Sequence, residues 1–404
     1  MPINGTSEAG LRRIRLGMVG GGRDAFIGAV HRIASRIDDN YELVAGCFSS
    51  SAEKSQASGA DLGLDRRRVY DDFLSMAKRE ARLTAGVEAV AIVTPNHMHY
   101  PVAREFLKRG IHVICDKPLT ATLKDARKLV KLVEKAGVKF ILTHNYTGYP
   151  MVRQARAMVE RGELGDIRVV HVEYVQDWLS EDLESSGQKQ AGWRTDPARS
   201  GAGGSTGDIG THAFNLVQFV TGMKLEALSA DLHAFVKGRR LDDNGHVLLR
   251  FEGGARGMLW CSQVAPGNEN GLRLRVYGSK GGLEWAQEHP NHLWSAPLGE
   301  PKRLLSRNGA GTGPEAARVS RVPPGHPEGY LEGFANIYAE AAIAIRAATS
   351  GATVPQEVMY PDVHDGLAGV AFVDACVRYV AARDMLRNFR IGLPRWGTLR
   401  PAAT

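Results

Sequence analysis

The chain has 404 residues, of which 43% are hydrophobic and 24% are charged, so it falls in the globular range and outside the disordered and membrane classes. Its length favours two domains. The formal net charge is +7. Because basic residues are interspersed with acidic ones and no basic run contains interleaved aromatics, we expect an anionic small molecule as partner and not nucleic acid.

The four cysteines indicate a reducing compartment. Cys47, Cys115, Cys261 and Cys376 are widely separated single residues, which fits neither a disulfide framework nor paired zinc ligands. The early apolar stretch at 14–22 is too short and too rich in glycine for a signal peptide or a membrane-spanning helix. We therefore expect a cytoplasmic protein that does not associate with membranes.

The first part of the chain alternates short apolar runs with helical patterns. Strands are expected at 14–20, 41–48, 89–95, 112–118 and 139–146, and helices at 30–37, 69–80, 101–110 and 123–137. This alternation predicts a parallel sheet with crossover helices. Residues 1–145 are therefore interpreted as a Rossmann dinucleotide-binding domain in a protein of the α/β class.

The second part shows longer strand patterns separated by turn residues. Strands are expected at 167–178, 227–236, 246–254, 257–264 and 272–285, helices at 329–348 and 363–383, and long loops at 180–192 and 306–329. We expect the two helices to close the second domain. Residues 146–404 are interpreted as an α+β domain with a large, mostly antiparallel open sheet that binds substrate and forms oligomer contacts.

A glycine-rich loop follows the first expected strand. Glycines let the backbone approach a pyrophosphate, and a helix N-terminus offers N–H groups to it. The last glycine, Gly28, arrives three residues later than in G-x-G-x-x-G, so a glycine-rich surface turn is the alternative from this motif alone. The expected cofactor contacts here are Gly20, Gly22, Ala25, Phe26 and Ile27.

The end of the second expected strand leaves the choice of nicotinamide cofactor open. An acid there, about 20 residues after the glycine loop, usually binds the adenosine ribose of NAD. This chain has Ser49, Ser50 and Ser51, with neither an acid nor an adjacent arginine for a ribose phosphate. We expect Ser49 to contact the cofactor, which is NAD(H) or NADP(H).

Three further motifs follow the glycine loop in order: Thr94-Pro95-Asn96, Asp116-Lys117-Pro118 and the segment 207–212, GDIGTH. With 243–254 and 278–285, they make the chain resemble the Gfo/Idh/MocA family of glucose-fructose oxidoreductase and inositol dehydrogenase. The resemblance implies a nicotinamide-dependent enzyme that transfers a hydride to or from a ring carbon of a sugar, glycoside, anhydrosugar or inositol.

The same resemblance implies that Lys117, Asp208 and His212 form the catalytic trio. Oxidation of an alcohol needs a base for the hydroxyl proton, and a histidine of ordinary pKa suits that role. Lys117 can donate a hydrogen bond to the reacting oxygen. Asp208 lies four residues before His212, so in a helix both would face one side, where the carboxylate orients the substrate or the imidazole.

Further cofactor contacts are expected at the carboxyl ends of the strands, where dinucleotides bind. These are Thr94, Asn96, His99, Asp116, Lys117 and Asn145, with capping of the next helix as the alternative for His99. The family usually has glutamate where this chain has Asp116, so the shorter side chain is expected to shift or bridge its contact.

The expected substrate site combines several hydroxyl-binding groups with an aromatic wall. Beside the catalytic trio it contains Tyr146, Tyr149, Gln176, Asp177, Trp178, Trp193, Arg194 and His326. The stretch 174–178 is similar to family members that oxidise anhydrosugars or glycosides, and aromatics at a subunit contact are the alternative. A large flat sheet face needs cover, so a homodimer or homotetramer is expected.

Three other functions are compatible with parts of the sequence. Asp208 and His212 could be metal ligands, but no third ligand has a convincing place, so no metal is expected. A glycosidase that uses NAD for transient oxidation and elimination would need an extra base, such as Tyr146, Tyr149 or His326. A non-catalytic nucleotide sensor is disfavoured because the trio is complete.

Overall fold

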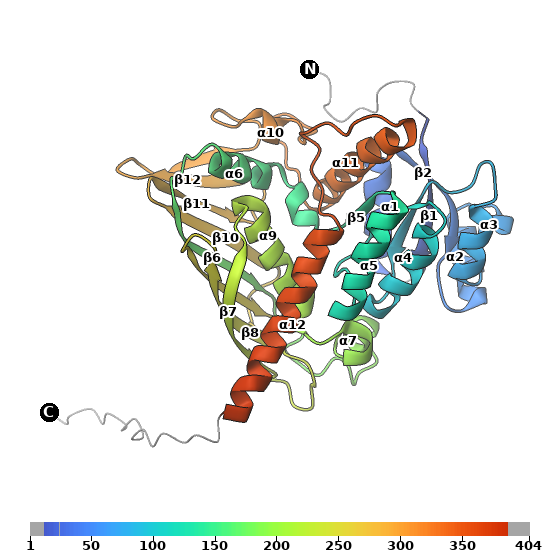
Figure 1. Cartoon of the computed structure of the whole chain (residues 1–404), viewed down its shortest axis with the longest axis horizontal. Coiled ribbons are helices and arrows are strands. Elements are labelled where there is room, and N and C mark those ends of the chain that lie inside the picture. Colours follow the sequence, from blue (N-terminus) through green and yellow to red (C-terminus); the bar gives the residue numbers. More distant parts are fainter. Residues whose placement is uncertain (1–11, 24, 387–404) are drawn as a thin grey trace.

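The chain folds into two sheets with helices between and around them (Figure 1). The computed structural model describes residues 12–23 and 25–386. Five parallel strands form the first sheet and eight mostly antiparallel strands form the second. The expected α/β class, a Rossmann domain followed by a domain with a large open sheet, is confirmed.

The first sheet has the strand order β2-β1-β3-β4-β5. Its strands are β1 (Ile14–Gly20), β2 (Tyr41–Cys47), β3 (Ala89–Val93), β4 (His112–Cys115) and β5 (Phe140–Leu142). Because β1 pairs with both β2 and β3, the direction of winding reverses beside β1. In open α/β sheets the crevice beyond such a reversal is where dinucleotides bind.

Helices connect these strands. They are α1 (Phe26–Ile37), α2 (Ala52–Asp61), α3 (Phe73–Glu80), α4 (His99–Leu107) and α5 (Leu123–Ala136). Helix α2 is not predicted by the sequence pattern, because its sequence AEKSQASGAD carries small and polar residues and no large apolar stripe. Helix α5 is clearer in the sequence, since Thr122 caps its start and Gly137 ends it with a φ of +67°.

The second sheet has the order β13-β12-β11-β10-β6-β9-β8-β7, and only β6 and β9 among these neighbours are parallel. Its strands are β6 (Ile167–Val175), β7 (Leu225–His233), β8 (Asn244–Phe251), β9 (Arg256–Ser262), β10 (Gly271–Gly278), β11 (Gly281–Ala286), β12 (His292–Pro297) and β13 (Arg303–Ser306). The expected strand 272–285 is a hairpin of two strands. Strands β12 and β13 were missed because they are short and weakly patterned.

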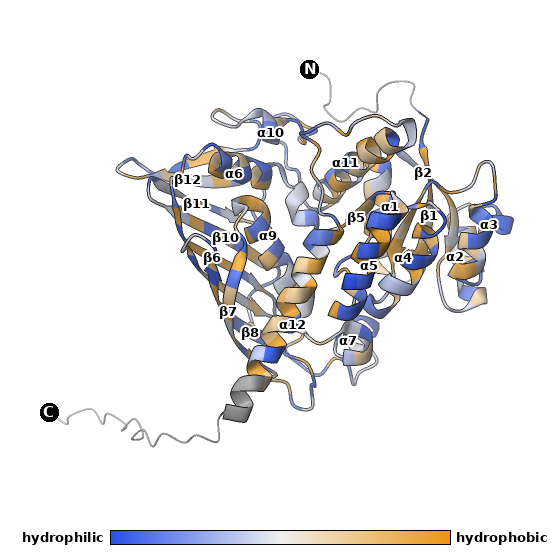
Figure 2. Ribbon diagram, viewed as in Figure 1, coloured by the Kyte–Doolittle hydropathy of each residue, from blue (hydrophilic) through white to orange (hydrophobic). Residues whose placement is uncertain are grey.

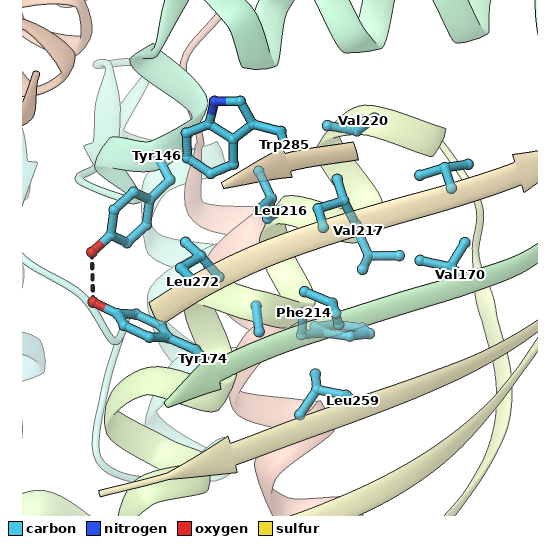
Figure 3. Packing of buried hydrophobic residues seen from close by; sticks show 14 of the residues in the cluster. Tyr146, Val170, Tyr174, Phe214, Leu216, Val217, Val220, Leu259, Leu272 and Trp285 are labelled. Carbon is cyan, nitrogen blue, oxygen red and sulfur yellow. Dashed lines mark hydrogen bonds between the residues drawn. The ribbon is translucent and has the colours of Figure 1, made fainter. Parts of the chain in front are cut away.

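One face of the second sheet is packed and the other is open. The packed face is covered by α6 (Pro150–Glu160), α9 (Thr211–Thr221) and part of α12 (Val363–Leu386). Figure 3 shows the side chains of Leu259 and Leu272 on the strands beside Phe214 and Val217 of α9. Strand β8 alternates accordingly, with Leu249 buried and its neighbour Leu248 exposed.

Two short helices fall in regions expected as loops, and a third lies just after the first of these regions. Helices α7 (Lys189–Arg194) and α8 (Pro197–Ser200) follow β6, and α10 (Pro314–Ala317) follows β13. Helix α7 overlaps the end of the segment 180–192, and α10 lies inside 306–329. These helices are only one or two turns long, so they are too short to show a helical pattern within a glycine- and serine-rich sequence.

The last two helices join the two sheets instead of closing the second domain. Helix α11 (Tyr330–Ser350) lies beside α1 and buries Phe334 and Ile337 in the core of the first sheet (Figure 1). Helix α12 contributes Val363 to the core shared with α5, while its Phe372 stacks on Phe214 at 4.4 Å. Apolar residues accordingly recur along the coloured part of α12 (Figure 2). Periodicity predicted both helices but could not say which sheet each one covers.

A buried ion pair fixes α11 to the second domain. Arg153 of α6 places Nη1 3.0 Å from Oε1 of Glu340 in α11, and both side chains are 1% exposed. Arg153 also donates to the carbonyl oxygens of Thr147 and Met359, and Arg318 donates to Glu340. Burial lowers the pKa of Arg153 to about 10 and raises the pKa of Glu340. The charged forms of Arg153 and Glu340 therefore stabilise each other.

Removing one partner should destabilise the protein strongly. We expect Glu340→Ala to lower the free energy of unfolding by about 3 to 5 kcal/mol, because Arg153 remains buried without its counter-ion. Urea unfolding followed by circular dichroism measures the change. The control is Glu160→Ala, which removes a 56% exposed carboxylate paired with Arg156 and should cost less than about 1 kcal/mol. Equal losses in the two variants would contradict the role given to Glu340.

Candidate active site

The glycine loop after β1 is built for close backbone approach. Gly20 and Gly21 have φ values of +84° and +71°, a region that favours glycine. A Cβ on Gly28 would lie 2.3 Å from the Cα of Gly21, and one on Gly22 would lie 2.8 Å from the carbonyl oxygen of Phe48. The loop therefore leads tightly into the N-terminus of α1. This geometry fits a pyrophosphate.

Two buried polar atoms beyond the first sheet lack a partner and fit a hydroxyl-rich ligand. Thr94 Oγ1 follows β3 and Asn145 Nδ2 follows β5, and neither atom has a hydrogen-bond partner in the described chain. Between them, Asp116 Oδ1 accepts from the backbone N–H of Lys117 at 2.9 Å and from Thr143 Oγ1 at 3.2 Å. The residues present thus fit a dinucleotide lying across the strand ends.

The other expected cofactor residues take different positions. Phe26 begins α1 and is 68% exposed beside the loop, with Ala25 before it and the partly buried Ile27 after it. Ser49 Oγ accepts from the backbone N–H of Ser51, which caps α2.

Asn96 and His99 bind the protein itself. Asn96 Nδ2 donates to the carbonyl oxygen of Ser200 at 2.8 Å. The buried His99 ring places Nδ1 2.7 Å from the carbonyl oxygen of Pro118 and Nε2 2.9 Å from that of Thr94. His99 therefore joins the loops after β3 and β4, and both of its ring nitrogens are occupied. Any effect of His99 on a cofactor would be indirect.

A lysine and an aspartate connect the two domains at the centre of the site. Lys117 Nζ, after β4, lies 2.7 Å from both Oδ1 and the backbone oxygen of Asp208. Asp208 lies in a single π-helical turn, Thr206–Gly210, that leads into α9, and such turns are frequent at functional sites. Gln263 and Arg194 donate to Asp208 Oδ2. Burial alone raises the pKa of Asp208, but Lys117 and Arg194 outweigh it and hold the pKa well below its usual range.

His212 is the second residue of α9 and lies within the same site. Its ring centroid is 4.9 Å from that of Tyr146 and 5.2 Å from that of His144. The sequence suggested an unperturbed histidine, and this was wrong: burial, followed by the nearby charge of Lys117, lowers the pKa of His212 well below its ordinary value. His212 is therefore held in the neutral form, which can accept a proton.

Three residues near the trio, Tyr174, Asn270 and Gln263, were not anticipated from the sequence, whereas Tyr146 was. The hydroxyls of Tyr146 and Tyr174 lie 2.5 Å apart (Figure 3), and Tyr174 also donates to Asn270 Oδ1 at 2.8 Å. Gln263 is the first residue after β9 and contacts Asp208. The one feature of the sequence that could have indicated Tyr174 and Gln263 as site residues is their position at the ends of strands.

Tyr330 also lies near the site although it is remote in sequence. This first residue of α11 stacks on Phe26, with ring centroids 6.4 Å apart. Burial raises the pKa of its hydroxyl, and Tyr146 and Asp116 contribute to the shift. Tyr330 thus lies between the glycine loop and the substrate side.

Four of the expected substrate residues, Gln176, Trp178, Trp193 and Arg194, gather at the ends of β6 and α7. Gln176 donates to Asn270 and accepts from Trp178 Nε1. The Arg194 guanidinium lies 4.3 Å from the ring centroid of Trp193 and 6.0 Å from that of Trp178. These side chains provide the expected combination of polar groups and an aromatic wall.

Three expected substrate residues lie apart or are occupied by other contacts. Tyr149 is buried against Trp285, with its hydroxyl inaccessible. Asp177 accepts from the backbone N–H of Gly267 at 3.2 Å. His326 is exposed in the loop before α11.

Other features of the described residues bear on the alternatives weighed from the sequence. No group of three or more His, Cys, Asp or Glu is arranged to hold a metal in this part of the chain. The four cysteines are free and buried. None of the described helices is long and apolar enough to span a bilayer.

Together the fold and the site define a nicotinamide-dependent oxidoreductase. Residues 14–155 match the oxidoreductase family with an NAD-binding Rossmann fold, and residues 152–284 match the GFO/IDH/MocA C-terminal domain. The chain belongs to the Gfo/Idh/MocA family.

Solved structures and a curated relative are similar over nearly the whole chain. An oxidoreductase from Sinorhizobium meliloti shares 63% identity at a TM-score of 0.85, covering 92% of this chain and 98% of that one. An inositol dehydrogenase homolog from Azotobacter vinelandii, complexed with NADH and myo-inositol, shares 36% identity at a TM-score of 0.88, covering 94% and 98%. The uncharacterized oxidoreductase YfiI of Bacillus subtilis is 37% identical over 369 residues, which are 90% of this chain and 94% of that protein.

The tight glycine loop predicts a specific loss of cofactor binding. We expect Gly28→Ala to weaken NADH binding at least about tenfold, or about 1.4 kcal/mol, because the new Cβ must displace Gly21. Nicotinamide fluorescence titration measures the affinity after circular dichroism has confirmed folding. The control is Gly369→Ala in α12, where a Cβ would meet Thr211 at an ordinary 3.9 Å. Unchanged NADH affinity in Gly28→Ala would contradict the placement of the cofactor.

Proposed function

We propose that this NAD-dependent oxidoreductase oxidises a ring hydroxyl of a cyclitol of the inositol class. The observation that carries the proposal is the contact of Lys117 with Asp208 across the domain boundary, beside the neutral His212. The A. vinelandii homolog, whose complex contains myo-inositol, supports this substrate class. The absence of an arginine directly after Ser49 and the NAD-binding family match favour NAD(H) over NADP(H).

The proposed chemistry needs a proton acceptor, an oxygen ligand and a hydride acceptor. NAD, when bound, supplies the hydride acceptor. We assign the hydroxyl proton to His212, whose Nε2 makes no hydrogen bond within the described residues. An ammonium group has three donors, and Lys117 uses two of them on Asp208, so one remains for the reacting oxygen. Asp208 therefore fixes the position of the Lys117 ammonium group.

The substrate side can recognise several neighbouring hydroxyls. Tyr146, Tyr174, Asn270 and Gln176 form one chain of hydrogen bonds beside His212. Such a chain can exchange partners with the hydroxyls of a ring that carries one on every carbon. Cyclitols have this pattern, and this match is the reason for preferring them.

The glycosidase alternative has less support. It needs an extra base, yet the Tyr149 hydroxyl is inaccessible and His326 lies on an exposed loop. Burial raises the pKa of Tyr146, which makes the phenol a poor base. None of the relatives described above is named as a glycosidase.

Activity assays test the proposal directly. The protein is incubated with NAD or NADP and a panel of inositols, free sugars, anhydrosugars and glycosides, while reduced nicotinamide and released aglycone are both measured. We expect reduced NAD to accumulate with an inositol, and Lys117→Met or His212→Ala to lower kcat/KM by about 10² to 10⁴. The surface variant Glu160→Ala should retain full activity. Aglycone release without reduced cofactor would refute the dehydrogenase in favour of the glycosidase.

We also propose that the open face of the second sheet forms a homodimer or homotetramer contact. Leu248 pairs with Met258 on this face, and Trp294 pairs with Leu304, and all four side chains are at least 39% exposed. Adjacent exposed apolar pairs on a flat sheet are typical of an interface between subunits.

Charges on this face should separate the subunits. We expect the double variant Leu248→Glu, Met258→Glu to have a smaller mass than the wild-type protein in size-exclusion chromatography with light scattering, since like charges would oppose each other across the contact. The control is Leu83→Glu, an exposed leucine of the first domain. A wild-type protein that is itself monomeric would refute the proposed contact.

A further inference from the structure

The strand β5 ends beside the proposed base and supplies a second histidine to it. His144 Nδ1 lies 3.4 Å from His212 Nδ1, and the two rings are nearly perpendicular, at 84°. His144 is 2% exposed. We propose that His144 is a positioning residue that accepts the Nδ1–H of His212 and thereby leaves the Nε2 lone pair of His212 free for the substrate hydroxyl. This inference rests on the proposed function.

The contact allows two arrangements of protons, and only one of them is productive. A neutral imidazole has one nitrogen that donates and one that accepts. If His212 donates from Nδ1, its Nε2 is unprotonated and can act as the base. If His144 donated instead, His212 would carry its proton on Nε2 and could not accept another there. His144 must therefore be the acceptor whenever His212 is the base.

The carboxylate of Asp208 distinguishes the two histidine rings. Lys117 lies near both rings and opposes a positive charge on either one. Burial and Lys117 lower the pKa of both rings, and His144 lowers that of His212 further, but the carboxylate of Asp208 favours the charged form of His212 alone. The remaining titratable groups against His212, Tyr146 and Tyr174, are neutral because burial raises the pKa of each. His144 thus stays a neutral acceptor.

Main-chain hydrogen bonds hold the backbone of His144 in place for this role. The carbonyl oxygen of His144 accepts from Thr147 Oγ1 at 2.9 Å, and the backbone N–H of His144 donates to the carbonyl oxygen of Leu142 at 2.9 Å. The preceding Thr143 donates to Asp116. The segment after β5 therefore touches both the expected cofactor carboxylate and the base.

The proton balance of the step is simple. The substrate O–H bond breaks and its proton bonds to His212 Nε2, while the electron pair left on the oxygen forms the C=O bond as the carbinol C–H bond breaks. NAD, when bound, would accept the hydride. His212 then carries one positive charge. Its Nδ1–H···Nδ1 contact with His144 becomes charge-assisted and strengthens as the proton is taken up.

Two substitutions at His144 distinguish a role in positioning His212 from a role in packing alone. His144→Phe keeps a ring but removes the acceptor, whereas the amide oxygen of His144→Asn can take the place of Nδ1. We expect His144→Phe to lower kcat about 10-fold to 100-fold, with little change in NADH affinity, and to move the acid limb of the kcat/KM profile to lower pH, because the imidazolium loses its acceptor. His144→Asn should restore most of the rate and the wild-type limb.

A second measurement needs neither substrate nor a variant that folds poorly. Nitrogen-15 NMR of the histidine rings in the unliganded wild-type protein should show a proton on His212 Nδ1 and on His144 Nε2. The opposite pattern, or an active enzyme whose rate and pH profile are unaffected by His144→Phe, would overturn the inference. Failure of the wild-type protein to oxidise any polyol would instead count against the proposed function, and the NMR pattern would still be read independently.

Discussion

The site depends on one ion pair across the domain boundary, between Lys117 and Asp208. Lys117 follows a strand of the parallel sheet and Asp208 precedes a helix of the second domain, so the pair forms only when the two domains hold a fixed relation. A largely buried lysine and aspartate stabilise each other only when their charged atoms are close together. The relative position of the two domains must therefore be held within narrow limits. Helix α11, seated on the first sheet and bound to α6 through Arg153 and Glu340, supplies the rigid connection.

The charge of this pair also determines the state of the groups around it. Lys117, together with burial, keeps the two nearby histidines neutral, while Asp208 remains ionised in spite of its burial. A neutral histidine beside a fixed ammonium can take a proton at the moment when negative charge develops on a substrate oxygen. The packing of the two domains thus places charged and neutral groups side by side in a small, poorly solvated volume. His144, the neutral partner of His212, belongs to this arrangement.

The cofactor side follows a different constraint, the space available to the backbone. The first turn of α1 lies so close to the glycine loop that a single methyl group at Gly28 would collide with it. Thr94 and Asn145 point polar atoms that lack protein partners toward the same strand ends. The glycine loop and the two polar atoms both belong to the first domain, whose strands and helices are joined by short connections. They do not depend on the position of the second sheet.

The sequence alone determined the class of the fold, the five parallel strands and the glycine loop, because periodicity, turn residues and short motifs are local properties. The catalytic trio of Lys117, Asp208 and His212 came from the family resemblance and stays a prediction. Tertiary structure decided which sheet α11 and α12 cover, the partner of each ionised group and the depressed pKa of His212, since these depend on burial and on residues far apart in the chain. It also selected among the candidates, bringing Gln176 and Arg194 to the site and leaving Tyr149 in the core. His144, Gln263 and Tyr330 could not have been chosen from the sequence, because each one acquires its role from a neighbour at least 55 positions away or from another domain.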